Sequence, residues 1–588
     1  HLMLPDESNQ SRVDLEPYRK EFRRFIDSGS QAKRSWTVKA KVALHQYTGV
    51  YHTYHDEGGT RIWVDESLAR GIFKVPVVPR LVDLSATTIM AEPSNWHARP
   101  AGSTQEDAQA AEAKTLIIRE HEQRNAVHVN NITLSRGLVT TGKNFKKLYT
   151  EESIVPIEIP KEIFEYWRKM KTERDGREPV IQEVYRAAED KLRVYTKLPV
   201  IRETNITPFS MIVETGARNL DEAQVFACHE LRSRRWIEQQ FPDFDVEKLK
   251  PQSITDRHMP VDRYGTGGSS SYSYDQQTGD SFSPEANLVR VYDCFMRLNN
   301  GNWLHMVLAG NRYEILLAEE TQTHNYVDYT CNPIEDYFWG YGLVDRVKDL
   351  QRGVNRSATD LKLNLHENMK DIIVLSHEQR DKVGTHYGSV LYQNPRNPFR
   401  PFRMEMPTSA HQVLKDHLQS DIQYCYEVFG FSEASLGKTK SHVTAMGMQL
   451  AQRADQSTLH TIRTYLNEGE RRKNQKLLRM AKDIFDEPRF VAIAGAGNAK
   501  IYDRVIHSQD VGGAVDVVLK DSVALPATKD ERFQLMQNLM QSGAFQPGNE
   551  AALQRAREFV NMETGLLPQD SSERMERDRA TREGEWIA

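Results

Sequence analysis

The chain has 588 residues, enough for two or more domains with sizeable buried cores. Hydrophobic residues make up 39% and charged residues 27%, as in well-solvated globular proteins, and no stretch approaches the roughly 18 uninterrupted apolar residues of a membrane helix. The formal net charge of −5 argues against a protein that coats DNA by neutralising its phosphates throughout, although local basic rings could still touch DNA.

The cysteines and the first residues add two further expectations. The four cysteines are far apart and form no CxxC pair, which argues against a disulfide framework or a zinc ribbon and fits a reducing compartment. The opening residues, HLMLPDESNQ, lack the apolar core of a signal peptide, so we expect none.

The first 241 residues predict a mixture of helices and short strands. Residues 10–35 are charged and predicted to be helical, whereas 36–100 contain the β-like runs TVKAKVALHQYT and GIFKVPVVPRLV. A helix is predicted from Ser103, because STQEDAQAAEAKTLIIREHEQR starts with capping hydroxyls and continues with acids in its first turn. A second helix is predicted over 219–241, stopped by Pro242.

Residues 264–284 are rich in Gly, Ser, Tyr and Asp, a composition that predicts a flexible surface loop. The segment that follows, LVRVYDCFMRLNNGNWLHMVLAGNRYEILLAE, predicts three strands, the first two joined at Asn299-Asn300-Gly301.

A long amphipathic helix is predicted over 340–375. Its apolar or small residues recur in steps of three and four, at Leu343, Val347, Leu350, Val354, Ala358, Leu361, Leu365, Met369 and Ile372. Such a helix would be on the order of 50 Å long. One narrow stripe with polar flanks of both signs suits a helix that packs beside copies of itself or beside one partner helix.

The next segments suggest a helix, an irregular excursion and a helix that returns. Residues 376–408 hold three prolines between 395 and 401 together with Arg396, Arg400 and Arg403, and should not be helical there. A second amphipathic helix is predicted from Thr408 or Ser409 to Gly430. After a loop, a third long helix covers roughly 442–486, followed by the strand-like runs RFVAIAG and AVDVVLKDSVALP and by a charged helical tail over 528–588.

Two glycine-containing motifs resemble nucleotide sites only in part. Gly437-Lys438-Thr439 could end a phosphate-binding loop, but Ser432 stands where the first glycine is required, and an amphipathic helix precedes the loop instead of a buried strand. GAGN at 495–498 has two of the three glycines of a dinucleotide fingerprint, so we expect a turn. An ATP-driven DNA translocase that uses Lys438 is kept as an alternative function.

No catalytic motif stands out. HExxH, GxSxG and paired acidic motifs are absent, and His52 and His55 fit ordinary surface or strand positions. Cys228-His229-Glu230, interpreted as part of the helix at 219–241, would point in divergent directions. We therefore expect no enzymatic activity, no metal and no cofactor.

The remaining chemistry is positive charge on short segments. Lys438, Lys440 and His442 lie within five residues of one another on a loop between two long helices, so copies arranged in a ring would gather them into one annulus. The alternative is an ordinary solvated loop. Arginines beside aromatics near residue 400 suit protein contact, the alternative being a rigid solvated loop.

With these features, the chain resembles the portal proteins of tailed double-stranded DNA bacteriophages, over roughly residues 90–545. The most specific stretch is YFWGYGLVDRVKDLQRGVNRSATDL, and VFGFSEASLG is similar to the family's exit from its second stem helix, with Ser432 in place of the usual proline. STQEDAQAAEAKTLIIRE and ITPFSMIVETGARNLDEAQ resemble the wing pattern, and LPATKDERFQLMQNLMQSGAF resembles the segment that leads to the crown.

The resemblance implies an α+β portal fold whose parts follow in chain order. These are a wing (1–340), a first stem helix (341–375), a clip (376–408), a second stem helix (409–430), a tunnel loop (431–443), a long wing helix (444–487), a β-rich return to the wing (488–527) and a helical crown (528–588).

The resemblance also implies a function. Portal proteins form a ring, usually of twelve copies, at one capsid vertex of the virion, after assembly in the host cytoplasm. Double-stranded DNA passes through the ring during packaging by the terminase motor, and the ring then serves DNA retention, tail attachment and ejection. The implied partners are the large terminase subunit, head–tail adaptor or tail proteins, and major capsid and scaffold proteins, with no membrane. Another head–tail adaptor ring is the remaining alternative, although adaptors are usually much shorter.

Three groups of site residues follow from the resemblance. The residues expected to face DNA in the tunnel loop are Lys438, Thr439, Lys440 and His442. Those expected to contact terminase or an adaptor through the clip are Arg396, Phe399, Arg400, Phe402 and Arg403. Those expected to pack between subunits in the stem are Val347, Leu350, Val354, Leu361, Leu365, Leu414, Leu418 and Ile422.

Overall fold

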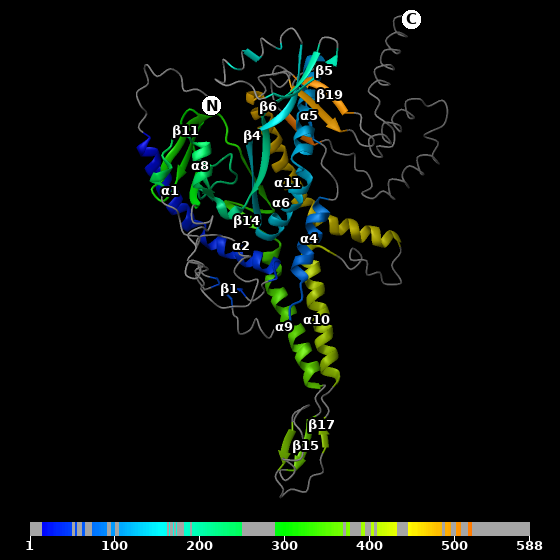
Figure 1. Ribbon diagram of the computed structural model, residues 1–588. Coiled ribbons are helices and arrows are strands. Elements are labelled where there is room, and N and C mark those ends of the chain that lie inside the picture. The colour runs from blue at the N-terminus through cyan, green and yellow to red at the C-terminus, as the bar shows by residue number, and fades with distance from the viewer. Residues whose placement is uncertain are drawn as a thin grey trace, which may run out of the picture. The chain divides into compact units, whose positions relative to one another are not determined.

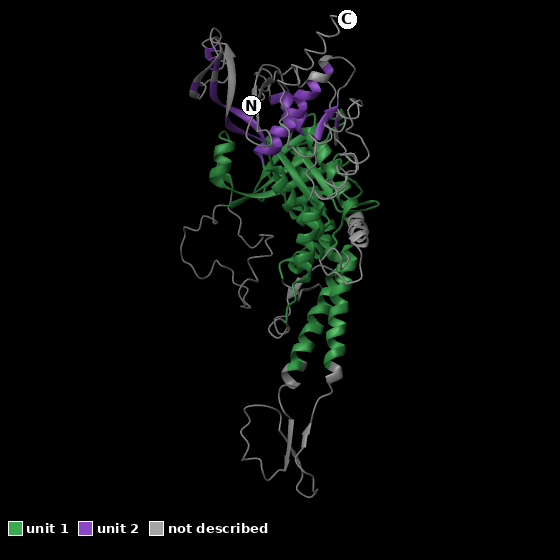
Figure 2. Cartoon of the chain, turned by 90° about the vertical axis from the view of Figure 1, so that its right-hand side faces the viewer, with its two compact units in different colours: residues 1–93, 126–149, 203–476 green, residues 94–125, 150–202, 477–588 purple. Residues whose placement is uncertain are grey.

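The structure is a computed structural model, and it combines helices and strands in an α+β arrangement (Figure 1). It describes residues 15–49, 53–55, 62–64, 73–90, 96–99, 105–160, 164, 168–169, 172, 181–188, 191–249, 288–368, 372–376, 390–393, 402–404, 408–431, 445–484, 489–494, 501–506 and 516–519. The chain divides into two compact units, coloured separately in Figure 2. Unit 1 comprises residues 1–93, 126–149 and 203–476, and unit 2 comprises 94–125, 150–202 and 477–588.

The N-terminal part of unit 1 is helical. Its helices are α1 (Glu16–Ala32), α2 (Arg34–Tyr47), α4 (Val77–Ile89) and α6 (Val127–Thr141). The β-like reading of TVKAKVALHQYT and of the VPVVPRLV part of the second run was therefore wrong. In α2, Trp36, Ala40 and Ala43 are buried at helical spacing, so packing of this face overrides the strand preference of its β-branched residues. Strands β1 (Thr53–His55) and β2 (Ile62–Val64) form a small antiparallel pair.

The largest sheet of unit 1 is antiparallel, with the order β11-β10-β9-β8-β7. Its strands are β7 (Met211–Val213), β8 (Val225–Ser233), β9 (Leu288–Arg297), β10 (Trp303–Ala309) and β11 (Glu314–Thr321). The three strands predicted over this last part are confirmed, and Gly301 takes a positive φ of 87° in the turn between the first two.

Strand β8 contradicts the helix predicted over 219–241. Only Arg234–Gln240 is helical there (α8), because residues 225–233 pair with β9 along their whole length, from Val225 opposite Met296 to Ser233 opposite Leu288. The segment NLDEAQVFACHELRSRRWIEQQF begins with acids and continues to bases, as a helix often does, and this polarity was misleading. In the strand, Cys228 and Glu230 lie on one face of the sheet and His229 on the other, so the three side chains do not converge on one site.

Strands of a second sheet contact the third long helix, which is described below. Strand β12 (Tyr326–Thr330) of this sheet pairs with residues 143–147 of β4 (Lys143–Pro160) inside unit 1. The end of β6 (Lys191–Ile206) also lies in unit 1, and β13 (Asn332–Ile334) with β14 (Tyr337–Tyr341) forms a short hairpin. Among the described residues, short 3₁₀ turns lie at Pro208–Ser210 and Val246–Lys248.

Three helices follow, the first two in unit 1 and the third in unit 1 up to residue 476. Helix α9 (Val344–Asn368) is shorter than predicted, since the β-branched run from Ile372 forms strand β15 (Ile372–Ser376). β15 is the centre of a three-stranded sheet with β16 (Val390–Gln393) and β17 (Phe402–Met404). Helix α10 (Thr408–Phe429) ends at Gly430, which has a positive φ of 82°, as expected for a helix stop. Helix α11 (Ala445–Ile484) confirms the third long helix.

Unit 2 contains α5 (Gln105–Arg124), which confirms the helix predicted from Ser103. Strand β3 (Trp96–Arg99) pairs with β20 (Asp516–Leu519), β5 (Ile181–Ala188) pairs with the start of β6, and β18 (Arg489–Ala494) pairs with β19 (Ile501–Ile506). All three pairs are antiparallel. GAGN lies outside the described residues, between two strands, whereas a dinucleotide fingerprint leads from a strand into a helix.

Candidate functional site

Helices α9 and α10 lie side by side, as both views of the chain show (Figure 1, Figure 2). Asp421 of α10 marks their contact. Its Oδ2 accepts a hydrogen bond from Ser357 Oγ at 3.2 Å and lies 3.1 Å from His417 Nδ1. Gly353 of α9 faces the same carboxylate with room for a methyl group, since an added Cβ would lie 3.8 Å from Asp421 Oδ2.

The residues predicted to pack in the stem fall into different environments. Val347 and Val354 are fully buried within the chain, in a core shared with α4, α6 and α11. Leu350, Leu418 and Ile422 are partly buried and pack against this core, and Leu361 and Leu414 are half-buried. Leu365 is 43% exposed, so among these residues it is the one best placed to contact another molecule. Packing of the stem residues between subunits stays a prediction.

Polar residues of α9 bind the backbone of the segment that enters α4. Gln351 Oε1 accepts from Val78 N–H at 3.0 Å, and Gln351 Nε2 donates to Val75 O at 2.7 Å. Asn355 Oδ1 accepts from Val75 N–H at 2.9 Å. One turn further along α9, Thr359 Oγ1 accepts from the N–H of residue 73 at 2.9 Å. We call Gln351, Asn355 and Thr359 the α9 ladder.

The α9 ladder was missed from the sequence, although a signal was present. Its members recur every four residues beside the apolar stripe and are almost completely buried, the least so being Thr359 at 9%. Buried amides require partners, and here the partners are backbone groups of an extended segment, which need hydrogen bonds as well. The ladder therefore joins α9 to α4.

Four buried charged side chains meet where helix α11 packs against two strands. Lys146 of β4 lies 3.0 Å from Glu203 Oε1 and 2.9 Å from Glu470 Oε1. Lys473 lies 3.2 Å from Glu203 Oε2 and 2.7 Å from Glu470 Oε2. We call these four residues, two cations and two anions from two strands and α11, the buried quartet. Tyr329 donates its hydroxyl to Glu470 at 2.8 Å.

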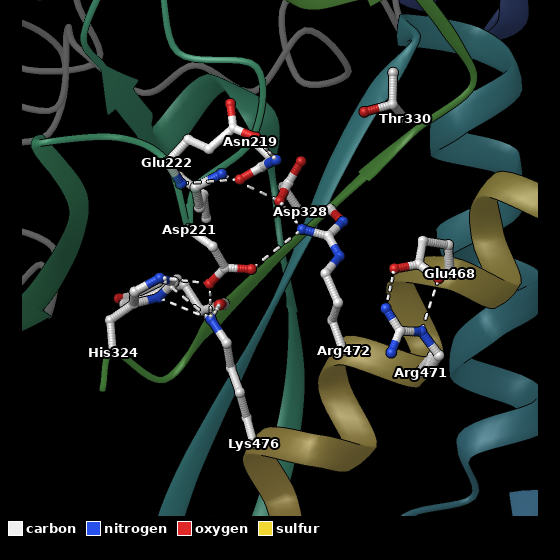
Figure 3. A network of polar contacts seen from close by, with 12 residues as sticks. Asn219, Asp221, Glu222, His324, Asp328, Thr330, Glu468, Arg471, Arg472 and Lys476 are labelled. Carbon is white, nitrogen blue, oxygen red and sulfur yellow. Dashed lines mark hydrogen bonds and ion pairs between the residues drawn. The ribbon is translucent and has the colours of Figure 1, made fainter. Parts of the chain in front are cut away.

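A second group of charges adjoins the buried quartet (Figure 3). Asp328 of β12 accepts from Lys143 Nζ at 2.8 Å and from Arg472 at 2.8 Å. Asp221 lies 2.6 Å from Lys476 Nζ and 3.0 Å from His324 Nε2. Arg472 and Lys476 thus connect α11 to a strand and to the turn before β8.

The electrostatics show which of these groups are charged. Burial opposes ionisation of Glu470, but Lys146 and Lys473 outweigh it and lower the pKa of Glu470 to about 2. Burial and the neighbouring Lys476 lower the pKa of His324 to about 4, so this histidine is neutral at pH 7. Burial lowers the pKa of Lys476 to about 8 against the pull of Asp221, which leaves it mostly protonated at pH 7.

Several predicted residues lie outside the described part of the chain. These are Lys438, Thr439, Lys440 and His442 of the tunnel loop, and Arg396, Phe399 and Arg400 of the clip. Phe402 and Arg403 lie in β17, opposite Val374 and Ile373 of β15.

The described residues contain no group of three or more His, Cys, Asp or Glu placed to hold a metal ion. Their four cysteines are buried, and burial raises the pKa of Cys228, Cys331 and Cys425 to about 12, which removes the thiolate needed for nucleophilic chemistry. Within the same part of the chain, no helix combines the length and apolar character needed to span a bilayer.

Comparison with known proteins defines the class as a phage portal protein. Residues 101–563 match the family described as "Phage SU10 portal protein", which covers most of the chain. The chain therefore belongs to this portal protein family, a family of virion ring proteins that surround DNA at a capsid vertex. A search of curated proteins found no match.

Proposed function

We propose that the chain forms the DNA conduit at one capsid vertex, through which the terminase motor packages the genome and from which the genome is later ejected. The observation that carries the proposal is the family match over residues 101–563. The order of elements supports it, because α9 and α10 flank a small sheet in the chain and the long helix α11 follows them.

Finer roles belong to the same proposal. The ring would hold twelve copies, and residues 376–408 would form the clip that binds the large terminase subunit and later a head–tail adaptor or tail protein. Major capsid and scaffold proteins would contact the wing. The loop at 431–443 would present Lys438, Thr439, Lys440 and His442 to passing DNA, and a few cations suit this task because strong phosphate neutralisation would stall the duplex.

Assembly is tested by end-on averages and mass photometry of the purified chain, with and without a scaffold that nucleates assembly. A ring with a central opening wide enough for a duplex is expected. A chain that stays monomeric under every assembly condition would contradict the proposal. The alternative translocase predicts ATP turnover that is lost in Lys438→Ala, whereas the conduit predicts no turnover in either protein.

The tunnel-loop role predicts the effect of removing its two lysines. Lys438→Ala combined with Lys440→Ala should leave the ring intact and change DNA retention or packaging, because fewer cations would meet the phosphates in each subunit. Packaged DNA per particle and leakage from filled heads measure this. The matched control is Lys39→Ala with Lys248→Ala, which removes two exposed cations elsewhere. Loss of the ring itself would show that the loop is structural.

A further inference from the structure

Residues of the strands β4, β6 and β12 contact helix α11 at several nearby positions. The side chains of the buried quartet are at most 2% exposed, so each one depends on the partner opposite it. Removing one member of a buried ion pair is far more costly than replacing the whole set by apolar groups, because it leaves a buried charge without compensation. A displaced α11 would leave these buried charges mispaired, so the buried quartet disfavours other positions of the helix.

Gly469 adds an independent steric constraint. A Cβ on Gly469 would lie 2.4 Å from Cδ1 of Tyr329, a distance that no ordinary side-chain contact allows. The backbone of α11 therefore approaches the buried Tyr329 ring as closely as only glycine permits. This contact involves the strand β12, which also carries Asp328.

A movement of α11 by one turn would violate both constraints. One turn is 3.6 residues, so a sliding helix would present residues three or four positions away to the same partners. A three-residue shift in one direction places Lys473 in the position of Glu470, beside Lys146. The same shift in the other direction places Glu470 in the position of Lys473, beside Glu203. After a shift of three or four residues in either direction, the side chain that meets the Tyr329 ring in place of Gly469 is that of Tyr465, Leu466, Arg472 or Lys473.

We propose that the buried quartet and the Gly469–Tyr329 contact hold α11 in a single axial and rotational register against β4, β6 and β12. The register determines where α11 directs the chain that precedes it. In the proposed portal, and only if that function holds, these are therefore positioning residues for the tunnel loop at 431–443, although they do not touch DNA.

The test measures the position of α11 directly. Spin labels at Thr464→Cys on α11 and Asn299→Cys in the β9–β10 turn, both exposed, should give one narrow distance distribution in the full chain. The test variant removes both constraints with Lys146→Met, Glu203→Leu, Tyr329→Leu, Glu470→Leu and Lys473→Met. We expect it to unfold cooperatively, but to show a broadened or second distribution displaced by roughly one helical turn, about 5 Å.

A control on the same helix is Glu468→Gln with Arg471→Gln, which removes an exposed pair and should leave the distribution unchanged. A narrow, unshifted distribution in the test variant would overturn the inference. If that variant does not fold, the milder set Lys146→Met, Glu203→Gln, Tyr329→Leu, Glu470→Gln and Lys473→Met removes the same charges and the same ring with smaller changes in shape, and an unchanged distribution there would overturn the inference as well.

The steric part is tested separately. Gly469→Ala should lower the melting temperature, and adding Tyr329→Leu should recover part of the loss, since it removes the ring that the new methyl group meets. Gly353→Ala is the matched control, because α9 has room for a methyl group there. Strictly additive losses from Gly469→Ala and Tyr329→Leu would contradict the contact. The two proposals can fail separately. If the test variant shows a broadened distance distribution but the protein with Lys438→Ala and Lys440→Ala retains DNA as the wild type does, the inference about the register of α11 stands and the proposed role of the tunnel loop is rejected.

Discussion

At the residue scale, His305 is held as a cation by two carboxylates. Its Nε2 lies 2.6 Å from Asp293 Oδ1, and its Nδ1 lies 2.8 Å from Glu319 Oε1. Asp293 also binds Lys147 and accepts the Tyr326 hydroxyl at 2.7 Å. Burial disfavours the imidazolium, but the hydrogen bonds and charges of the two carboxylates outweigh burial and raise the pKa of His305 to about 9.

This raised pKa predicts a loss of stability in mild alkali. An unfolded histidine titrates near pH 6.5, so the contribution of His305 is fully present below that pH and is lost as the pH rises towards 9. Between these limits, the free energy of unfolding of the wild type should fall by roughly 3 kcal/mol relative to that of His305→Gln. Urea unfolding at a series of pH values measures the difference.

His324→Gln provides the comparison for this experiment. The pKa of His324 is lowered to about 4, so protonation of this histidine costs stability only as the pH falls from about 6.5 towards 4. In mild alkali, the difference in the free energy of unfolding between the wild type and His324→Gln should therefore stay constant, whereas the difference between the wild type and His305→Gln should change steeply. Equal slopes in mild alkali for the wild type and His305→Gln would show that the two carboxylates do not hold the histidine charged.

At the element scale, the α9 ladder predicts that the chain loses stability when a hydrogen bond between α9 and the segment before α4 is removed. Gln351→Leu keeps most of the side-chain volume but leaves Val78 N–H without its partner, whereas Val75 O keeps the hydrogen bond that it accepts from Val77 N–H. The unsatisfied N–H should lower the free energy of unfolding by about 1–3 kcal/mol. Hydrogen exchange at Val78 should accelerate more than exchange within α5.

The control for the ladder is an exposed glutamine on the neighbouring helix. Gln412 of α10 bonds Asp416 on the surface, so Gln412→Leu should change stability by no more than about 0.5 kcal/mol. A Gln351→Leu protein as stable as this control would contradict the predicted dependence of the chain on the hydrogen bond from Val78 N–H to Gln351.

The same elements show what sequence reasoning could and could not reach. The ends and stripes of α10 and α11 were predictable because capping residues and helical periodicity are local signals. The strand β8 was not, because its partner β9 lies more than fifty residues away and pairing with it overrides local helix preference. The buried quartet was hidden for a related reason, since Glu470 and Lys473 resemble an ordinary solvated pair until Lys146 and Glu203 are brought opposite them.

At the scale of the whole molecule, the predicted stem residues separate into those that hold the chain together and those available for assembly. Val354 is fully buried in the chain's own core, whereas Leu365 is 43% exposed near the end of α9. An exposed leucine at this place contributes little to the folding of one chain. In a ring of side-by-side helices, the same side chain would be covered by the neighbouring copy.

Two substitutions should therefore have opposite effects. Leu365→Glu should leave the free energy of unfolding of the isolated chain within about 0.5 kcal/mol but prevent ring assembly, because a carboxylate would be buried in the contact between copies. Val354→Ala should lower the free energy of unfolding by about 2 kcal/mol through the cavity it leaves, while folded chains still assemble. Mass photometry and thermal unfolding of both proteins separate the two effects. Normal rings from Leu365→Glu would place the contact between copies elsewhere than on this part of α9.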